Sequence, residues 1–206
     1  MRLDFHKNHW LLFGVIFFGF IAIGLLIAIG PAIWVQNNSH PLPGAEPLTE
    51  AEFAGLQVYL AEGCVYCHTQ QVRPVAMDAV YGRPSAPGDY AYLNALGPFS
   101  PNAPAVLGSQ RTGPDLSNVG RRQPSEAWQL LHLYNPRTVV PDSVMPAFPW
   151  MFEVKAEADE DDVVVAVPPS HAPEVGVVVA GQKALDLTAY LLSLSQVPIE
   201  DTAVAP

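Results

Sequence analysis

The sequence predicts a mainly α-helical protein in which one N-terminal transmembrane helix is followed by a single domain with long loops. An uninterrupted apolar run near the N-terminus predicts the membrane helix, and three later segments with helix start signals predict the domain. Stretches rich in proline and glycine separate these segments and predict the loops. The 206 residues, 50% of them hydrophobic, suffice for one packed core.

The apolar run covers residues 11–29 and contains no charged side chain. At about 1.5 Å per residue it spans roughly 28 Å, close to the roughly 30 Å hydrocarbon core of a bilayer. Trp10 and Trp34 flank the run, where aromatic rings favour the membrane interface. A cleaved signal peptide has an apolar region of only about 7 to 15 residues and a small-residue cleavage site, unlike residues 31–34. We therefore expect an uncleaved anchor.

Basic residues predict how the anchor crosses the membrane. Arg2 and Lys7 precede it, and the next basic residue that follows it is Arg73. The positive-inside rule then places the N-terminus in the cytoplasm and the remainder of the chain outside. We expect a single-pass protein of the bacterial inner membrane, with its main domain on the periplasmic side.

Behind the anchor, local signals predict one domain. The predicted division is a cytoplasmic N-terminus and anchor at 1–35, a proline-rich linker at 36–47, the domain at 48–197 and a C-terminal tail at 198–206. A capping box formed by Thr49 and Glu52 predicts a first helix that ends near Gly63. The second helix is predicted from Ser125 to just before Pro136, and the third at 182–195. A long loop is expected at 83–114, and two valine-rich stretches at 163–167 and 175–179 suit a short hairpin.

The charge of the chain argues against one class of partner. A formal net charge of −10 does not suit a nucleic-acid-binding protein, which needs a basic face to neutralise phosphates. The acidic run at 157–162 is interpreted as a solvated loop, and the alternative is a docking patch for a basic donor cytochrome.

The motif Cys64-Val65-Tyr66-Cys67-His68 carries the chemistry of the sequence. This C-x-x-C-H pattern is the attachment signature of c-type haem, in which the two cysteines reach the vinyl groups of one porphyrin and the histidine lies beneath the iron. A tetrahedral zinc site needs about four ligands, and these are the only two cysteines. A thioredoxin-like redox pair normally sits in a βαβ pattern, which is absent here, and a structural disulfide would close only a tiny loop.

The second axial ligand of the iron decides between a carrier, an enzyme and a sensor. Met145 is the favoured ligand because it lies in a proline-rich loop between the two later helices. Met77 is close to the haem motif in sequence, and Met151 is more simply interpreted as packing beside its aromatic neighbours. Ligation by histidine and methionine raises the reduction potential and suits electron transfer rather than catalysis.

Further residues are candidates for supporting the haem. The backbone carbonyl of Pro114 is a candidate acceptor for the free ring nitrogen of His68, although the residues around it also suit a simple turn. Arg73, Arg111 and Arg137 are candidates for binding the haem propionates, and each equally suits a solvated surface position. His132 is interpreted as a packed or exposed histidine rather than a competing ligand.

In combination, these motifs resemble those of the mono-haem subunit II of cbb3-type cytochrome c oxidases, the CcoO or FixO family. The blocks that carry the resemblance are Gly63-Cys64-Val65-Tyr66-Cys67-His68-Thr69-Gln70, Gln71-Val72-Arg73-Pro74, Gly108-Ser109-Gln110-Arg111-Thr112-Gly113-Pro114-Asp115-Leu116, His132-Leu133-Tyr134-Asn135-Pro136-Arg137, Val140-Pro141-Asp142-Ser143 and Met145-Pro146-Ala147-Phe148-Pro149-Trp150. The chain departs from the family pattern in a longer segment at 92–107, and beyond Lys155 the likeness is confined to the final helix.

The resemblance implies a class I cytochrome c fold for residues 48–197 and one covalent haem c. Carried over by position, Cys64 and Cys67 attach the haem, and His68 and Met145 ligate its iron. The implied partners are a haem-copper catalytic subunit, a further cytochrome c subunit and an upstream electron donor such as a soluble cytochrome. The chain is then an electron-transfer subunit and not an enzyme by itself. Two competing functions are the anchored cytochrome of a nitric oxide reductase-like complex, and a haem gas sensor or peroxidase.

Overall fold

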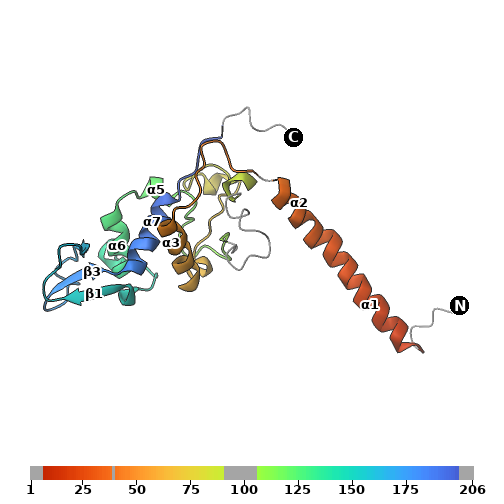
Figure 1. Cartoon of the computed structure of the whole chain (residues 1–206), viewed down its shortest axis with the longest axis horizontal. Coiled ribbons are helices and arrows are strands. Elements are labelled where there is room, and N and C mark those ends of the chain that lie inside the picture. Colours follow the sequence, from red (N-terminus) through yellow and green to blue (C-terminus); the bar gives the residue numbers. More distant parts are fainter. Residues whose placement is uncertain (1–6, 39, 91–105, 200–206) are drawn as a thin grey trace.

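The computed structural model describes residues 7–38, 40–90 and 106–199 (Figure 1). These residues are mostly helical, with one long helix near the N-terminus that extends away from a separate domain (Figure 1). The predicted fold class, a mainly α protein with one N-terminal helix suited to a membrane, is confirmed.

The N-terminal helix consists of α1 at His9–Ile23, a π-helical segment at Gly24–Ile29 and α2 at Gly30–Asn38. Asn8 caps its start by accepting a hydrogen bond from the backbone N–H of Leu11 at 3.1 Å. Within the described ranges, His9–Val35 is the one helix long and apolar enough to cross a membrane, with a mean hydropathy of 2.9 and none of it buried. The helix continues to Asn38, into the predicted linker, because no proline or glycine interrupts residues 32–38.

Three longer helices build the domain, and the sequence predicted all three. Helix α3 at Glu50–Ala61 begins with the expected capping box, in which the Thr49 N–H donates to Glu52 at 2.7 Å. Helix α6 at Glu126–Tyr134 begins after Ser125, whose hydroxyl accepts from the backbone N–H of Trp128 at 3.2 Å. Helix α7 at Gln182–Ser193 ends two residues before the predicted boundary.

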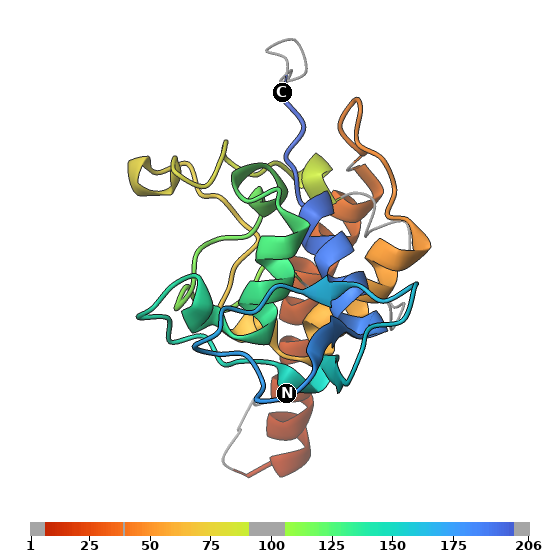
Figure 2. The same cartoon turned by 90° about the vertical axis from the view of Figure 1, so that its left-hand side faces the viewer.

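Helices α3 and α7 cross in close contact, and α7 lies between α3 and α6 (Figure 2). The approach requires a glycine at residue 55, because a Cβ atom there would overlap the backbone carbonyl of Asp186 on α7. One turn further along, the rings of Tyr59 and Tyr190 pack with centroids 5.6 Å apart. Both tyrosines are fully buried, so this crossing forms the centre of the core.

Replacing Gly55 with alanine is expected to lower the free energy of unfolding by about 3 kcal/mol, because the added methyl forces α3 away from α7. Urea unfolding of the full chain in detergent, followed by circular dichroism, measures the change. Ala51→Gly on the exposed side of α3 is the matched control and is expected to cost only about 1 kcal/mol. Equal losses for the two variants would contradict the close crossing.

A small antiparallel sheet with the strand order β1-β3-β2 packs beside the helices (Figure 2). Strand β2 at Val164–Val165 pairs with β3 at Val177–Ala180, which confirms the predicted pairing of the valine-rich stretches. Strand β1 at Phe152–Lys155 pairs with the other edge of β3 and was not predicted. In the acidic run between β1 and β2, the ammonium group of Lys155 binds both Asp159 and Asp162 at 2.8 Å.

The connections are mostly irregular, as the proline and glycine content predicted. In the parts of these connections that the structure describes there is one short helix, α5 at Val119–Arg122, which the sequence did not predict. The 3₁₀ turns are η2 at Cys64–Tyr66, η3 at Ala76–Asp78, η4 at Pro87–Tyr90, η5 at Pro136–Thr138 and η6 at Pro149–Met151. Most of the long segment singled out at 92–107 lies outside the described residues.

Candidate functional site

The haem-attachment motif follows directly after the C-terminus of α3. Gly63 takes a left-handed conformation with φ of 75°, which ends the helix and turns the chain. The next three residues form η2, and the His68 N–H donates to the Cys64 carbonyl at 3.0 Å. This tight turn brings both cysteines and His68 to the same side of α3.

Both cysteines and His68 line a cavity of about 610 Å³. Pro114 and Met145 line it too, so five of the eight predicted site residues meet at one place. The remaining wall is largely apolar and includes the core residues Leu116, Val119, Leu133, Phe148, Leu187 and Leu191. A largely apolar cavity with a few nitrogen and sulfur groups is typical of a site for a large planar cofactor.

The structure disfavours a redox pair, a disulfide and a zinc site at the two cysteines. The cysteines are not joined in a disulfide. Burial raises the pKa of the Cys64 thiol to about 12, whereas a thioredoxin-like pair depends on a lowered thiol pKa. Among the described residues, no group of three or more His, Cys, Asp or Glu side chains is arranged to hold a metal ion. The sequence also has only these two cysteines, fewer than the about four ligands of a tetrahedral zinc site.

His68 is held in a defined orientation by the segment that faces it. Its Nδ1 lies 2.8 Å from the carbonyl oxygen of Pro114, the acceptor expected from the sequence. Because a carbonyl only accepts, Nδ1 carries the proton, and the neutral ring keeps a free lone pair on Nε2. Burial lowers the pKa of His68, which favours this neutral form. Gly113 packs against the ring, and a Cβ atom there would lie 2.8 Å from Nδ1 and 2.9 Å from Nε2.

Met145 is the one described methionine that lines the cavity. Its loop is fixed at several points, since the backbone carbonyl of Met145 accepts from Arg137 at 3.0 Å and its N–H donates to Ser143 at 3.3 Å. Met77 is 72% exposed, and Met151 is 2% exposed within the core beside the cavity wall. The geometry thus favours Met145 over Met77 and Met151 as the second ligand.

The predicted arginines have different positions. Arg73 and Arg111 both bind the buried carboxylate of Asp78, at 2.9 and 2.6 Å, and neither is among the described residues that line the cavity. Arg137 does not line the cavity itself but donates a hydrogen bond to the backbone carbonyl of Met145, which does. Arg122, which the sequence interpretation missed, does line the cavity. No pattern distinguishes it from its neighbour Arg121, and only the folded chain reveals its place.

Helix α6 contributes an aromatic pair to the cavity wall. The rings of Trp128 and His132 stack with centroids 4.5 Å apart and an angle of 11° between their planes. Nδ1 of His132 is buried and has no hydrogen-bond partner among the described residues. Burial, together with nearby His68, lowers the pKa of His132 to about 4. A buried polar atom without a partner beside a cavity is a candidate contact for a bound group.

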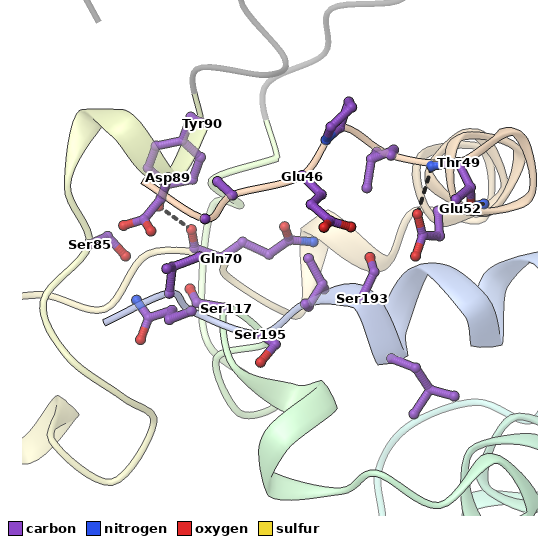
Figure 3. Close-up of a pocket in the computed structure, with 18 residues that line it drawn as sticks. Glu46, Thr49, Glu52, Gln70, Ser85, Asp89, Tyr90, Ser117, Ser193 and Ser195 are labelled. Atoms are coloured by element: carbon purple, nitrogen blue, oxygen red, sulfur yellow. Dashed lines mark hydrogen bonds between the residues drawn. The ribbon is translucent and has the colours of Figure 1, made fainter. Parts of the chain in front are cut away.

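A second cavity, of about 440 Å³, lies where the linker meets the end of α7 (Figure 3). Its lining is mixed, with Glu46, Gln70 and Ser117 among its polar members, and the Gln70 side chain extends toward Glu46 (Figure 3). On one side of this cavity, the Tyr90 hydroxyl donates a hydrogen bond to the backbone carbonyl of Gln70 at 2.5 Å. None of the eight predicted site residues lines this cavity, so the candidate site is the first one.

Comparison with known families identifies the chain. The model of the family described as "Cytochrome C oxidase, mono-heme subunit/FixO" matches residues 4–176, most of the 206-residue chain. The chain belongs to the FixO family. No curated protein matches it. The FixO match continues past Lys155 and ends before α7, so the expectation that the likeness beyond Lys155 is confined to the final helix was wrong.

Membership in the FixO family implies one haem and a place in cytochrome c oxidase. The cavity residues fit such a group, because they offer two thiols, a neutral imidazole with a free lone pair and a thioether within apolar walls. The orphaned Nδ1 of His132 and the Arg122 guanidinium at the wall add polar contacts suited to its carboxylates.

His132→Gln is expected to reduce the loss of stability that acid causes. The folded chain keeps His132 neutral down to about pH 4, whereas the unfolded chain protonates it near 6.5. Acidification through this window therefore favours unfolding, by about 3 kcal/mol at pH 4, and the effect is absent above pH 7. Urea unfolding of the full chain at pH 7 and pH 4.5 measures the difference. Exposed His171→Gln is the control, and the same pH dependence in both variants would contradict a neutral buried His132.

Proposed function

We propose that this chain is the electron-transfer subunit of a membrane-bound cbb3-type cytochrome c oxidase. It carries one covalent haem c and relays electrons toward the haem-copper subunit that reduces oxygen, without catalysing a reaction itself. The observation that carries the proposal is the convergence of Cys64, Cys67, His68 and Met145 on a single apolar cavity.

Each of these residues has a distinct role in the proposal. Cys64 and Cys67 form thioether bonds to the haem, His68 ligates the iron through Nε2, and Met145 ligates it through its sulfur. The bound haem supplies one-electron exchange at its iron. The Pro114 carbonyl keeps the His68 ring in one orientation and increases its basicity. The apolar walls exclude water, and the Met145 thioether keeps small molecules from the iron.

The long helix anchors this carrier beside its partners. In the proposal the N-terminus is cytoplasmic and the domain from residue 48 onward lies on the periplasmic side of the bacterial inner membrane. Support comes from Arg2 and Lys7, which precede the helix, and from the apolar surface of His9–Val35, which is exposed along its length. The partners are the haem-copper catalytic subunit, a further cytochrome c subunit and a donor such as a soluble cytochrome.

Purification from native membranes in mild detergent tests the proposal. We expect a haem-copper subunit to co-purify, one haem to stay attached to this chain under denaturing conditions, and the preparation to consume oxygen. Consumption of nitric oxide in place of oxygen would assign the chain to a nitric oxide reductase-like complex. Rapid carbon monoxide binding at this haem would indicate a sensor or peroxidase. Either result would overturn the proposed function.

A further inference from the structure

A buried carboxylate lies directly behind the Pro114 carbonyl that faces His68. Asp115 is fully buried and accepts four hydrogen bonds. The donors are the Thr69 hydroxyl at 2.6 Å, the Gln71 N–H at 2.8 Å, the Ser117 N–H at 2.9 Å and the Arg111 guanidinium at 3.3 Å. A buried carboxylate needs this many donors because it has lost its hydration.

Arg111 joins this carboxylate to a second one. Its Nε donates to the Thr69 hydroxyl at 2.6 Å, and one terminal nitrogen donates to Asp78 at 2.6 Å. Asp78 is 1% exposed and also binds Arg73 at 2.9 Å. These two arginines hold the pKa of the Asp78 carboxyl well below its usual range. Two cations and two anions therefore form a neutral cluster in which Arg111 is the central member.

The cluster fixes the alignment of two chain segments, one on each side of the contact between His68 and Pro114. Thr69 is the next residue after His68, and Asp115 is the next residue after Pro114. Two backbone hydrogen bonds continue the same pairing, from the Gly113 N–H to the Cys67 carbonyl at 2.9 Å and from the Leu116 N–H to the Thr69 carbonyl at 2.8 Å. Any shift of Asp115 relative to Thr69 therefore moves the Pro114 carbonyl away from Nδ1.

We propose that Arg111, Thr69 and Asp115 are positioning residues that hold the Pro114 carbonyl against His68 and thereby set the reduction potential of the haem. None of the three is among the described residues that line the cavity, so they act through the backbone and not by touching the haem. The hydrogen bond makes the imidazole a stronger electron donor, which stabilises oxidised iron. A weaker hydrogen bond between His68 Nδ1 and the Pro114 carbonyl therefore raises the reduction potential of the haem. The inference rests on the proposed function only in taking His68 as the iron ligand.

Two substitutions without a change of charge test this inference in the full chain in detergent. Arg111→Lys keeps the cation but loses the planar group that reaches Thr69, Asp78 and Asp115 together. Thr69→Val removes only the hydroxyl. In both variants we expect a higher potential in spectroelectrochemical titration, with about a tenfold change in the ratio of oxidised to reduced haem, or about 59 mV for one electron. In the same variants, the NMR chemical shift of the His68 Nδ1 proton is also expected to change. Thr69→Ser keeps the hydroxyl and is expected to restore the wild-type potential.

Arg83→Lys is the matched control, because Arg83 forms a similar pair with Asp89 at 2.6 Å and neither residue lines the haem cavity. We expect it to lower stability and leave the potential unchanged. Arg111→Lys and Thr69→Val variants that lose stability like this control, with an unchanged potential and proton signal, would overturn the inference while the proposed function stands. A wild-type chain without covalent haem overturns both. Thr69→Val decides the question alone if Arg111→Lys does not fold.

Discussion

Met145→Ala is expected to remove the absorption band that a thioether ligand gives to oxidised haem and to lower the reduction potential. Of the described methionines, only Met145 lines the cavity, so no other described thioether replaces it at the iron. The potential falls because methionine ligation favours reduced iron, and axial ligands tune haem potentials over about 0.8 V. A fall of about 59 mV alone changes the ratio of oxidised to reduced haem tenfold. Electron delivery to the oxidase is expected to drop accordingly. Optical titration and oxygen uptake measure both effects.

The chain supplies two controls for this substitution. Met77→Ala alters a side chain that is 72% exposed and is expected to change neither the spectrum nor the potential. Met151→Ala removes a buried side chain outside the cavity wall and is expected to cost about 2 to 5 kcal/mol of stability, with the thioether band retained. Persistence of the band in Met145→Ala, or its loss in either control, would show that Met145 is not the ligand.

Gly113→Ala is expected to disturb the wall of the cavity at His68. A Cβ atom at residue 113 would lie 2.8 Å from Nδ1 of His68 and 2.9 Å from Nε2, inside ordinary contact distance. In the proposed function His68 ligates the iron and its ring has little room to withdraw, so the methyl displaces either the ring or the Pro114 carbonyl. We expect about 1 to 3 kcal/mol of strain and a lower yield of chain with correctly ligated haem. Haem staining and resonance Raman spectra of the iron–histidine bond measure the outcome.

Gly55→Ala distinguishes strain at the ligand from general overpacking. Its added methyl collides with the Asp186 carbonyl at the crossing of α3 and α7, away from His68. Both variants are expected to lose stability, but only Gly113→Ala is expected to change the iron–histidine bond. Identical spectra for the two variants would mean that Gly113 serves packing alone.

The features that the sequence predicted correctly depend on residues close together in the chain. The capping box needs only Thr49 and Glu52, and the membrane helix needs only one apolar run. The end of α3 just before Gly63 needs only a glycine after the last apolar residues of the helix. Each of these signals lies within one continuous stretch of chain, so a single sequence displays it directly.

The features that the sequence did not reveal depend on partners distant in the chain. Phe152–Lys155 is a strand because it pairs with an edge of β3. Its four residues are too few to show the alternation of apolar and polar side chains that predicts a strand. Arg111 was placed near the haem because of its neighbours in sequence, but its ion-pair partner Asp78 lies 33 positions away. The fold decides which carboxylate an arginine pairs with, and the sequence around the arginine does not show that partner.

The haem cavity also has a consequence for how the protein matures. Its walls include Leu116, Leu133, Phe148, Leu187 and Leu191, which also belong to the hydrophobic core. These five side chains are 9% exposed or less and border the cavity, so a group that fills the cavity packs directly against the core and stabilises the fold. In the proposed function, haem held at Cys64 and Cys67 therefore stabilises the fold in addition to supplying redox chemistry. We expect the chain without haem to unfold more easily and to be cut faster by proteases.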